Sequence, residues 1–225
     1  EFYDKNERNR SNLTQEIRLS MGSIIMGGYF KQLIEQDEAM GYLYGGAATD
    51  ATSHYDFLVA AGYGQYGVNL TPSLKLKANV RFENNSIKYE GTSQGLNDYW
   101  EKIKLPPINF YIDHAMIGYR TSLHYLKDKF TSFYGSVSQG YKSGGVNQQP
   151  YLSDTSRPFD PEFIQNFEVG LNRVTNIYRT QLSAFYSLRK DQQVSLSSQQ
   201  VEGDPNSFLF YTTNAGSGTI QGFEW

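Results

Sequence analysis

Residues 74–83 alternate without exception between apolar and polar side chains, and no other feature constrains the fold of this chain as strongly. Successive side chains of a β-strand point to opposite faces of the sheet, so the alternation predicts a strand with one apolar and one polar face. Similar patterns recur over 15–21, 115–125, 163–171 and 178–189. The two predicted faces are Leu74, Leu76, Ala78, Val80 and Phe82 against Lys75, Lys77, Asn79, Arg81 and Glu83.

The connections between the predicted strands alternate between short turns and long polar loops through about nine strands. Bacterial outer-membrane barrels show this asymmetry, and several predicted strands reach the ~9–11 residues that a tilted membrane-spanning strand needs. A soluble antiparallel sheet with one wet face also alternates, and it is the competing interpretation. The pattern favours an all-β, antiparallel transmembrane β-barrel. The predicted turns are 22–23, 71–73, 127–129 and 173–176, and the predicted loops are 35–54, 84–112, 140–162 and 190–213.

The composition is compatible with membrane spanning by strands but not by helices. The 225-residue chain has a mean hydropathy of −0.55, and no apolar run approaches the ~18 residues of a spanning helix. Half of the residues in barrel strands face a polar lumen, which keeps the mean hydropathy low. The absence of cysteine agrees with an oxidising envelope compartment. A net charge of −3 without a basic run gives no indication of nucleic-acid binding.

Two neighbouring stretches resemble the barrel segment of TonB-dependent outer-membrane receptors: YGSVSQGYKSGGVN at 134–147 and FDPEFIQNFEVGLN at 159–172. Members of that family show a strand that ends in Ser-x-Gly-Tyr-Lys-Ser-Gly-Gly, followed by Pro-Glu and an aromatic-Glu-x-Gly strand. Three further pieces fit in the same order, LTQEIRLS at 13–20, SAFYSLRKDQQVS at 183–195 and NAGSGTIQGFEW at 214–225. The matching positions are Ser138, Gly140, Tyr141, Lys142, Ser143, Gly144, Gly145, Pro161, Glu162, Phe167, Glu168 and Gly170.

The resemblance implies a bacterial outer-membrane location and a barrel of about 22 strands around a plug domain. About nine strands cannot close such a barrel, so we expect residues 1–225 to be the central part of the barrel of a longer receptor, without its plug domain. The implied partners are the TonB complex, reached through that plug, a ferric siderophore or other small nutrient, and outer-membrane lipid and lipopolysaccharide. No cofactor is expected.

Catalytic patterns are weak in this sequence. His54, His114 and His124 lack metal-ligand spacing, and no G-x-S-x-G motif is present. The Lys142–Gly145 run is similar to part of a phosphate loop, but the full pattern is absent and we expect no helix after it. We therefore predict that the chain is not an enzyme. An outer-membrane hydrolase with Ser and His on the barrel is the enzymatic alternative.

Aromatic and charged residues in the predicted long loops are the candidates for ligand binding. Aromatic side chains with a polar tip can line a ligand vestibule. An aromatic girdle at the membrane interface uses the same residue types, and it is the alternative explanation near strand ends. The predicted binding residues are Tyr141, Lys142, Tyr151, Arg157, Phe159, Tyr42, Tyr44 and Trp100.

The family resemblance makes TonB-energised uptake of a scarce nutrient the predicted function, with a ferric siderophore as the default cargo. The four predicted loops contain 13 acidic and 6 basic residues, a balance that does not favour an anionic chelate. A neutral cargo such as a saccharide or cobalamin therefore stays open. A passive porin is the second class of function. A plug domain encoded upstream of Glu1 would decide for the receptor.

Overall fold

The computed structural model describes residues 4–43, 48–97, 99–149, 152–199, 202–203 and 208–225. Within these ranges the chain is almost entirely β-strand, with one short 3-10 helix, η2 (Asp154–Ser156). No helix in the same ranges is long and apolar enough to cross a membrane. The strands are β1 (Asp4–Met21), β2 (Ile24–Leu43), β3 (Ala48–Thr71), β4 (Leu74–Leu96), β5 (Lys102–Lys104), β6 (Ile108–Leu126), β7 (Thr131–Lys142), β8 (Gly145–Val146), β9 (Pro158–Phe159), β10 (Glu162–Val174), β11 (Arg179–Lys190), β12 (Gln193–Gln199), β13 (Phe208–Asn214) and β14 (Gly218–Glu224).

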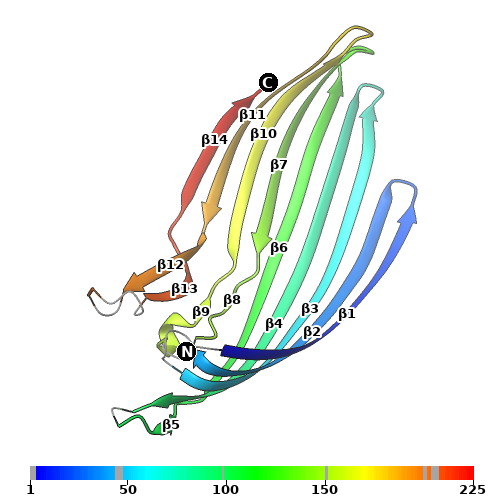
Figure 1. The fold of residues 1–225 in the computed structure, drawn as a ribbon. Helices are drawn as coiled ribbons and strands as arrows, with labels where there is room; N and C mark the ends of the chain where they lie inside the picture. The colour runs from blue at the N-terminus through cyan, green and yellow to red at the C-terminus, as the bar shows by residue number, and fades with distance from the viewer. Residues whose placement is uncertain (1–3, 44–47, 98, 150–151, 200–201, 204–207) are drawn as a thin grey trace.

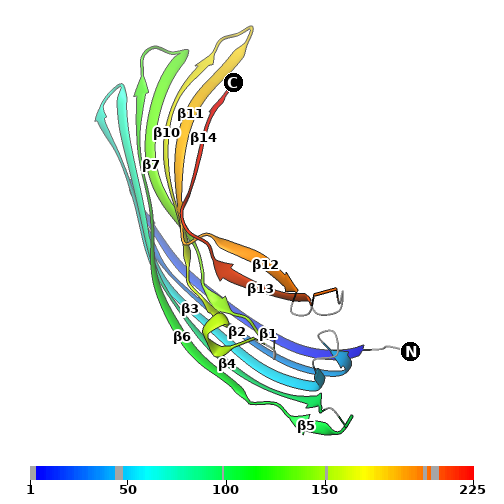
Figure 2. The same ribbon diagram turned by 90° about the vertical axis from the view of Figure 1, so that its left-hand side faces the viewer.

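Nine strands form one antiparallel sheet in the order β1-β2-β3-β4-β6-β7-β10-β11-β14, and β5 pairs with the end of β4. The sheet curves strongly, with a concave inner face and a convex outer face (Figures 1 and 2). Short turns join the strands at one end, and the longer connections lie at the other, which we call the loop end (Figure 1). The pairs β8–β9 and β12–β13 form two small separate sheets. The predicted all-β antiparallel architecture and the path of about nine strands are confirmed.

The pairing register confirms the two faces predicted for residues 74–83. Leu76 lies opposite Leu123, and directly paired residues of antiparallel strands project to the same side of a sheet. The apolar set therefore shares one face with the apolar side chains of β6, and this is the outer, convex face because the polar set points inward. Arg81, from the polar set, points to the inner face, where its Nε donates a hydrogen bond to the Tyr141 hydroxyl at 3.2 Å.

The loops predicted over 35–54 and 84–112 are wrong for most of their length. β2 and β3 run through the first, and β4 and β6 extend far into the second. The alternation continues there with reversed polarity, since Lys88 is exposed whereas Ile87 and Tyr89 are buried. Beyond a bilayer, water covers the outer face of a barrel, so apolar side chains are no longer required on it. The strands therefore continue after the lipid-facing pattern has ended.

The loops predicted over 140–162 and 190–213 also contain regular structure. The second holds the β12–β13 hairpin, which begins where Gln193 pairs with Asn214. The first holds the end of β7, the β8–β9 pair and η2. β8 and β9 have two residues each, which is too short for a periodic pattern. β13 begins with the run Phe208–Tyr211, which does not alternate, so periodicity did not reveal these strands.

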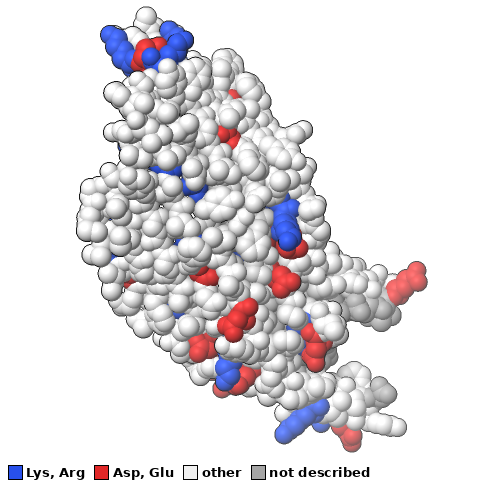
Figure 3. All heavy atoms as spheres, turned by 180° about the vertical axis from the view of Figure 1, so that it is seen from behind, with Lys and Arg blue, Asp and Glu red and all other residues white. Residues whose placement is uncertain are grey.

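The outer face carries an apolar belt. Figure 3 shows this face: charged side chains gather at the short turns and toward the loop end, and few lie in the belt between. Large exposed apolar side chains such as Phe82 and Val169 contribute to it. The inner face has instead a small buried cluster near the loop end, formed by Ile87, Tyr89 and Ile108 together with Val146 from β8.

Candidate functional site

The connection between β7 and β10 folds against the inner face of the sheet. We call residues 143–161 the inner loop (Figure 2). Val146 of this loop completes the buried cluster with Ile87 and Ile108, because the inner face becomes apolar toward the loop end. The Tyr89 hydroxyl, from the same wall, donates to the Gln148 carbonyl at 3.4 Å. Burial of this apolar surface holds the inner loop inside the curve of the sheet.

Two glycines permit this close approach. A Cβ added at Gly144 would collide with the His114 ring and the Phe159 carbonyl, and one added at Gly145 would collide with the Phe159 ring. The Ser143–Gly145 run therefore has a packing role. It is not a phosphate loop in this structure.

Asn147 is the central cross-link of the inner loop and is 6% exposed. Its side-chain amide donates to the carbonyls of Arg157 at 3.1 Å and Thr212 at 2.7 Å. Its side-chain oxygen accepts from the Thr212 backbone N–H at 2.8 Å. One buried amide thus joins both arms of the inner loop to the β12–β13 hairpin.

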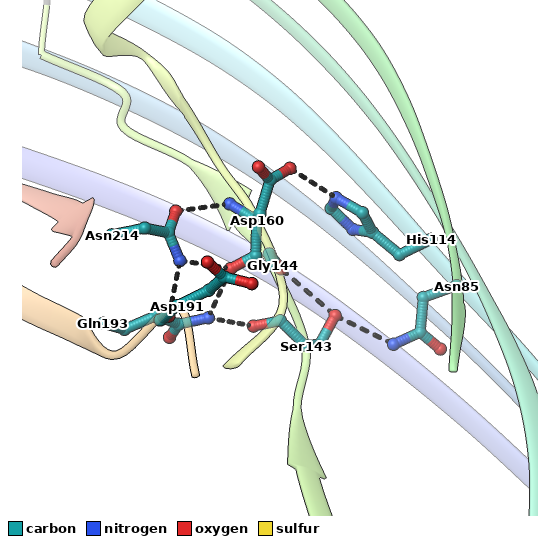
Figure 4. A network of polar contacts seen from close by, with 8 residues as sticks. All are labelled: Asn85, His114, Ser143, Gly144, Asp160, Asp191, Gln193 and Asn214. Atoms are coloured by element: carbon teal, nitrogen blue, oxygen red, sulfur yellow. Dashed lines mark hydrogen bonds and ion pairs between the residues drawn. The ribbon is translucent and has the colours of Figure 1, made fainter. Parts of the chain in front are cut away.

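A second polar network ties the base of the hairpin to the sheet wall (Figure 4). The Asn214 side chain accepts from the Asp160 backbone N–H at 2.7 Å and donates to the Asp160 carbonyl at 2.9 Å. The Gln193 side-chain amide donates to the Ser143 carbonyl at 2.8 Å. The Ser143 hydroxyl and the Asn85 side-chain amide are hydrogen-bonded at 2.8 Å. Sheet wall, inner loop and hairpin therefore form one connected body.

His114 lies at the edge of this network, beyond the apolar belt. Its Nε2 is 3.9 Å from the Asp160 carboxylate, and its Nδ1 is buried without a hydrogen-bond partner. Burial lowers the pKa of His114 below its usual 6.5, although Asp160 and Asp113 act in the opposite direction. The folded site therefore favours the neutral imidazole.

The arrangement offers no catalytic constellation among the described residues. The Ser143 hydroxyl hydrogen-bonds Asn85 and the Gly144 carbonyl, and no hydrogen bond joins it to His114 in the described part of the chain. No group of three or more His, Asp or Glu able to hold a metal occurs within the described ranges. The site is suited to holding a rigid polar surface at the loop end.

The structure brings some of the predicted binding residues together around the inner loop. The Tyr141 hydroxyl lies between Arg81 and Glu83 on the inner face, donating to the Glu83 carboxylate at 3.2 Å. Lys142 is exposed at the end of β7. Phe159 is half-buried, with its ring over Gly145.

Arg157 is buried, with 4% exposure, and its guanidinium is engaged within the loop. Its Nη1 donates to the Gln149 carbonyl at 2.5 Å and its Nε to Asp154 at 3.3 Å. An arginine in this setting stabilises the loop conformation. The sequence offered no signal for this, because a loop arginine has no periodic context.

Of the other predicted binding residues, Trp100 has a described side chain, and it lies apart from this group. Trp100 lies in the turn between β4 and β5, where it is 82% exposed. The Tyr42 backbone is part of β2, but its side chain lies outside the described residues, as do Tyr44 and Tyr151. Sequence reasoning missed the amides Asn147, Asn214, Gln193 and Asn85, which resemble ordinary loop or lumen residues until the segments meet.

Comparison with known proteins gives a consistent result. The family model described as TonB dependent receptor-like, beta-barrel, matches residues 1–225. The pesticin receptor of Yersinia pestis is 29% identical over 136 residues, which are 60% of this chain and 19% of that receptor. Its counterpart in Yersinia enterocolitica is 28% identical with the same coverage.

Solved structures share the fold. The ferric yersiniabactin uptake receptor FyuA from Yersinia pestis aligns with a TM-score of 0.73 and 20% identity, over 98% of this chain and 32% of that one. The copper transporter OprC aligns with a TM-score of 0.64 and 12% identity, over 98% of this chain and 35% of that one. The chain thus spans about a third of these solved proteins and a smaller part of the curated relatives.

Proposed function

Since the chain belongs to the TonB-dependent receptors, as part of their outer-membrane β-barrel, we propose that it serves a receptor that imports a ferric siderophore with energy supplied through TonB. The family match over all 225 residues carries this proposal. The sheet agrees with it, because its convex face has the apolar belt of a lipid-facing wall and its concave face is polar along the belt.

We further propose that residues 1–225 are a barrel segment and that the plug domain, which reaches the TonB complex, lies elsewhere in the longer protein. The short turns then face the periplasm and the loop end faces the outside. In this orientation, cargo that enters from outside would meet the inner loop. The proposal assigns binding, and no chemistry, to this chain.

The proposed cargo contacts are the eight residues predicted from sequence. Tyr141, Lys142 and Phe159 have the best support, since Tyr141 reaches the inner face, Lys142 is exposed at the end of β7 and Phe159 lies in the inner loop. Arg157 supports the loop conformation in its present position. A surface that is already rigid loses less conformational entropy when it binds, which favours high-affinity capture.

The test is uptake by the complete receptor. The full-length protein is expressed in a Gram-negative strain that lacks its own siderophore receptors, with TonB present or deleted, and labelled ferric siderophores are supplied. We expect saturable uptake that requires TonB. Uptake that is unaffected by loss of TonB would support a passive porin. TonB-dependent uptake of a saccharide or cobalamin, with none of a siderophore, would contradict the proposed cargo.

A further inference from the structure

The lipid-facing wall contains an apolar hollow of about 660 Å³. It crosses β1, β2, β3, β4 and β6 on the outer face and follows two adjacent rows of paired residues. In one row Phe30 lies opposite Ala60, which lies opposite Asn84. In the next row Gly28 lies opposite Gly62, which lies opposite Phe82.

The hollow exists because small residues meet in the middle of these rows. Gly28, Ala60 and Gly62 form its floor, and Ile17 and Phe82, both largely exposed, stand at its sides. A Cβ added at Gly62 would have no atom within 4 Å. The space above the floor is therefore open on the side that faces lipid.

The hollow lies in the half of the wall nearer the cell exterior. Gly62 is nine residues from Thr71 at the short turn, or roughly 30 Å along a strand and about 20 Å in height once the strand tilts, against an apolar band of about 25 Å. The rows beyond it toward the loop end are richer in polar side chains, although they also contain Leu13, Ile34 and Leu58. There the Gln32 side chain donates to Asp56 at 3.2 Å, and Ser86 donates to Asp113.

We propose that this hollow binds an acyl chain of the lipid A part of lipopolysaccharide, the lipid of the outer leaflet. The hollow is continuous with the lipid-facing belt, so hydrocarbon is its surrounding solvent, and an apolar cavity does not favour water. The polar side chains above it lie at head-group height, where they can hydrogen-bond the sugar hydroxyls and amides of lipid A. Lys88, a cation in these rows, is paired with Glu90 at 2.9 Å, so recognition relies on the acyl chain in the hollow and on the sugar.

This inference rests on the outer-membrane placement of the barrel and not on the cargo. Siderophore uptake measured in the same cells separates the two. A variant that fills the hollow leaves TonB-dependent uptake unchanged, because Gly62 lies on the outer face away from the inner loop.

The experiment places a photo-cross-linking phenylalanine analogue at Phe82 of the full-length receptor in outer membranes of living cells. Phe167 is the matched control, since it is also an exposed phenylalanine of the outer face and lies seven residues from its own short turn at Val174. We expect several-fold more lipopolysaccharide adduct at Phe82 than at Phe167. Gly62→Leu should reduce the Phe82 adduct to the Phe167 level, and Gly135→Leu, on the outer face of β7, should not.

Native mass spectrometry of the purified receptor provides a second readout, with fewer retained lipopolysaccharide molecules expected in Gly62→Leu. If Gly62→Leu fails to fold, Ala60→Leu fills the same space. Equal amounts of lipopolysaccharide adduct at Phe82 and Phe167 would mean that both positions contact only the surrounding bulk lipid, and this would overturn the proposal. An adduct at Phe82 made only of phospholipid, or only of a second receptor chain, would overturn it as well.

Discussion

At the scale of single residues, buried amides hold the loop end together. Asn147 satisfies backbone groups of Arg157, in the same loop, and of Thr212, which is 65 residues away in the sequence. Buried polar groups are costly when they lose their partners, so such a residue has a larger effect than its size suggests.

Asn147→Ala should release the inner loop from the hairpin. Removal of the amide leaves buried carbonyl and N–H groups unpaired, at a cost of about 1–3 kcal/mol for each affected group. Hydrogen exchange and limited proteolysis should show faster opening of residues 143–161 and little change in the strands of the belt. Asn109→Ala, at an exposed position on β6, is the control and should leave the exchange rates unchanged. Equal changes in the exchange rates of the two variants would contradict the role assigned to Asn147.

The stability of the inner loop should depend on pH through His114. Its pKa is lower in the folded site than its usual 6.5, because burial disfavours the charged ring. The state in which the inner loop has opened therefore binds the proton more readily than the closed state does. The contribution of neutral His114 to the stability of the closed loop is present above pH 6.5, and it is lost as the pH falls toward the lower pKa of the folded site. Exchange of the loop amides, corrected for intrinsic rates, should therefore accelerate between about pH 7 and pH 5. His114→Gln should flatten this dependence, and an identical pH profile in the variant would contradict the prediction.

At the scale of elements, β4 changes environment along its length. Its outer face is apolar up to Phe82 and polar from Asn84 onward, while the inner face changes in the opposite sense. The first half of β4 therefore faces lipid on its outer side. The second half faces water on its outer side and the inner loop on its inner side.

Arginine substitutions along β4 should reveal this change. Val80→Arg, on the outer face within the belt, should cost up to about 2–4 kcal/mol, whereas Asn79→Arg on the inner face should cost little. Ser86→Arg, on the outer face beyond the belt, should also cost little, because that position is wetted. Folding titrations into lipid vesicles provide the measurement. Equal costs at Val80 and Ser86 would place the membrane boundary elsewhere.

The end of β7 offers a test of cargo charge. Lys142 is exposed there, whereas Arg157, the other cation of this segment, is engaged within the inner loop. For an anionic ferric chelate, Lys142→Ala should weaken binding to whole cells by about 1.5–3 kcal/mol, and Lys142→Arg should retain most of the affinity. Lys104→Ala, at an exposed position on β5, serves as the matched charge control. Binding that is unchanged in Lys142→Ala would exclude Lys142 from the cargo site.

At the scale of the whole molecule, nine strands curve into part of a barrel wall with all short turns at one end (Figure 1). This arrangement assigns each connection to one side of the outer membrane. In the proposed orientation, the inner loop and the β12–β13 hairpin face the outside.

Cysteines placed at the two ends should report this topology. Ser153→Cys, exposed in the inner loop, should react with a membrane-impermeant reagent on intact cells. Ser73→Cys, exposed in the short turn between β3 and β4, should react only after the outer membrane has been permeabilised. If Ser73→Cys reacted on intact cells and Ser153→Cys did not, in folded protein, the barrel would have the opposite orientation in the membrane and every loop assignment would be wrong.

The fold of the belt could be predicted from local pattern, because a lipid-facing strand needs apolar residues at every second position. Leu74 to Phe82 follow this rule, and their register confirms it. The predicted strand ends were wrong where the rule stops applying, as at Ile87 and Tyr89, which are buried by a distant segment. Of the eight predicted site residues, Tyr141 and Lys142 lie beside the inner loop and Phe159 lies in it, and their role in binding stays a prediction.

The sequence by itself determined the strand periodicity and the positions of the short turns, since each follows from the local chemistry of a wall between lipid and water, and its motifs resembled the family to which the chain belongs. Only the tertiary structure decided how the loop end is built. Asn147 meets Thr212, and Asn214 meets Asp160, because the chain returns to the same place after more than fifty residues. Such contacts depend on which segments the curved sheet brings together, and a single amide in a polar loop has no periodic signal of its partner.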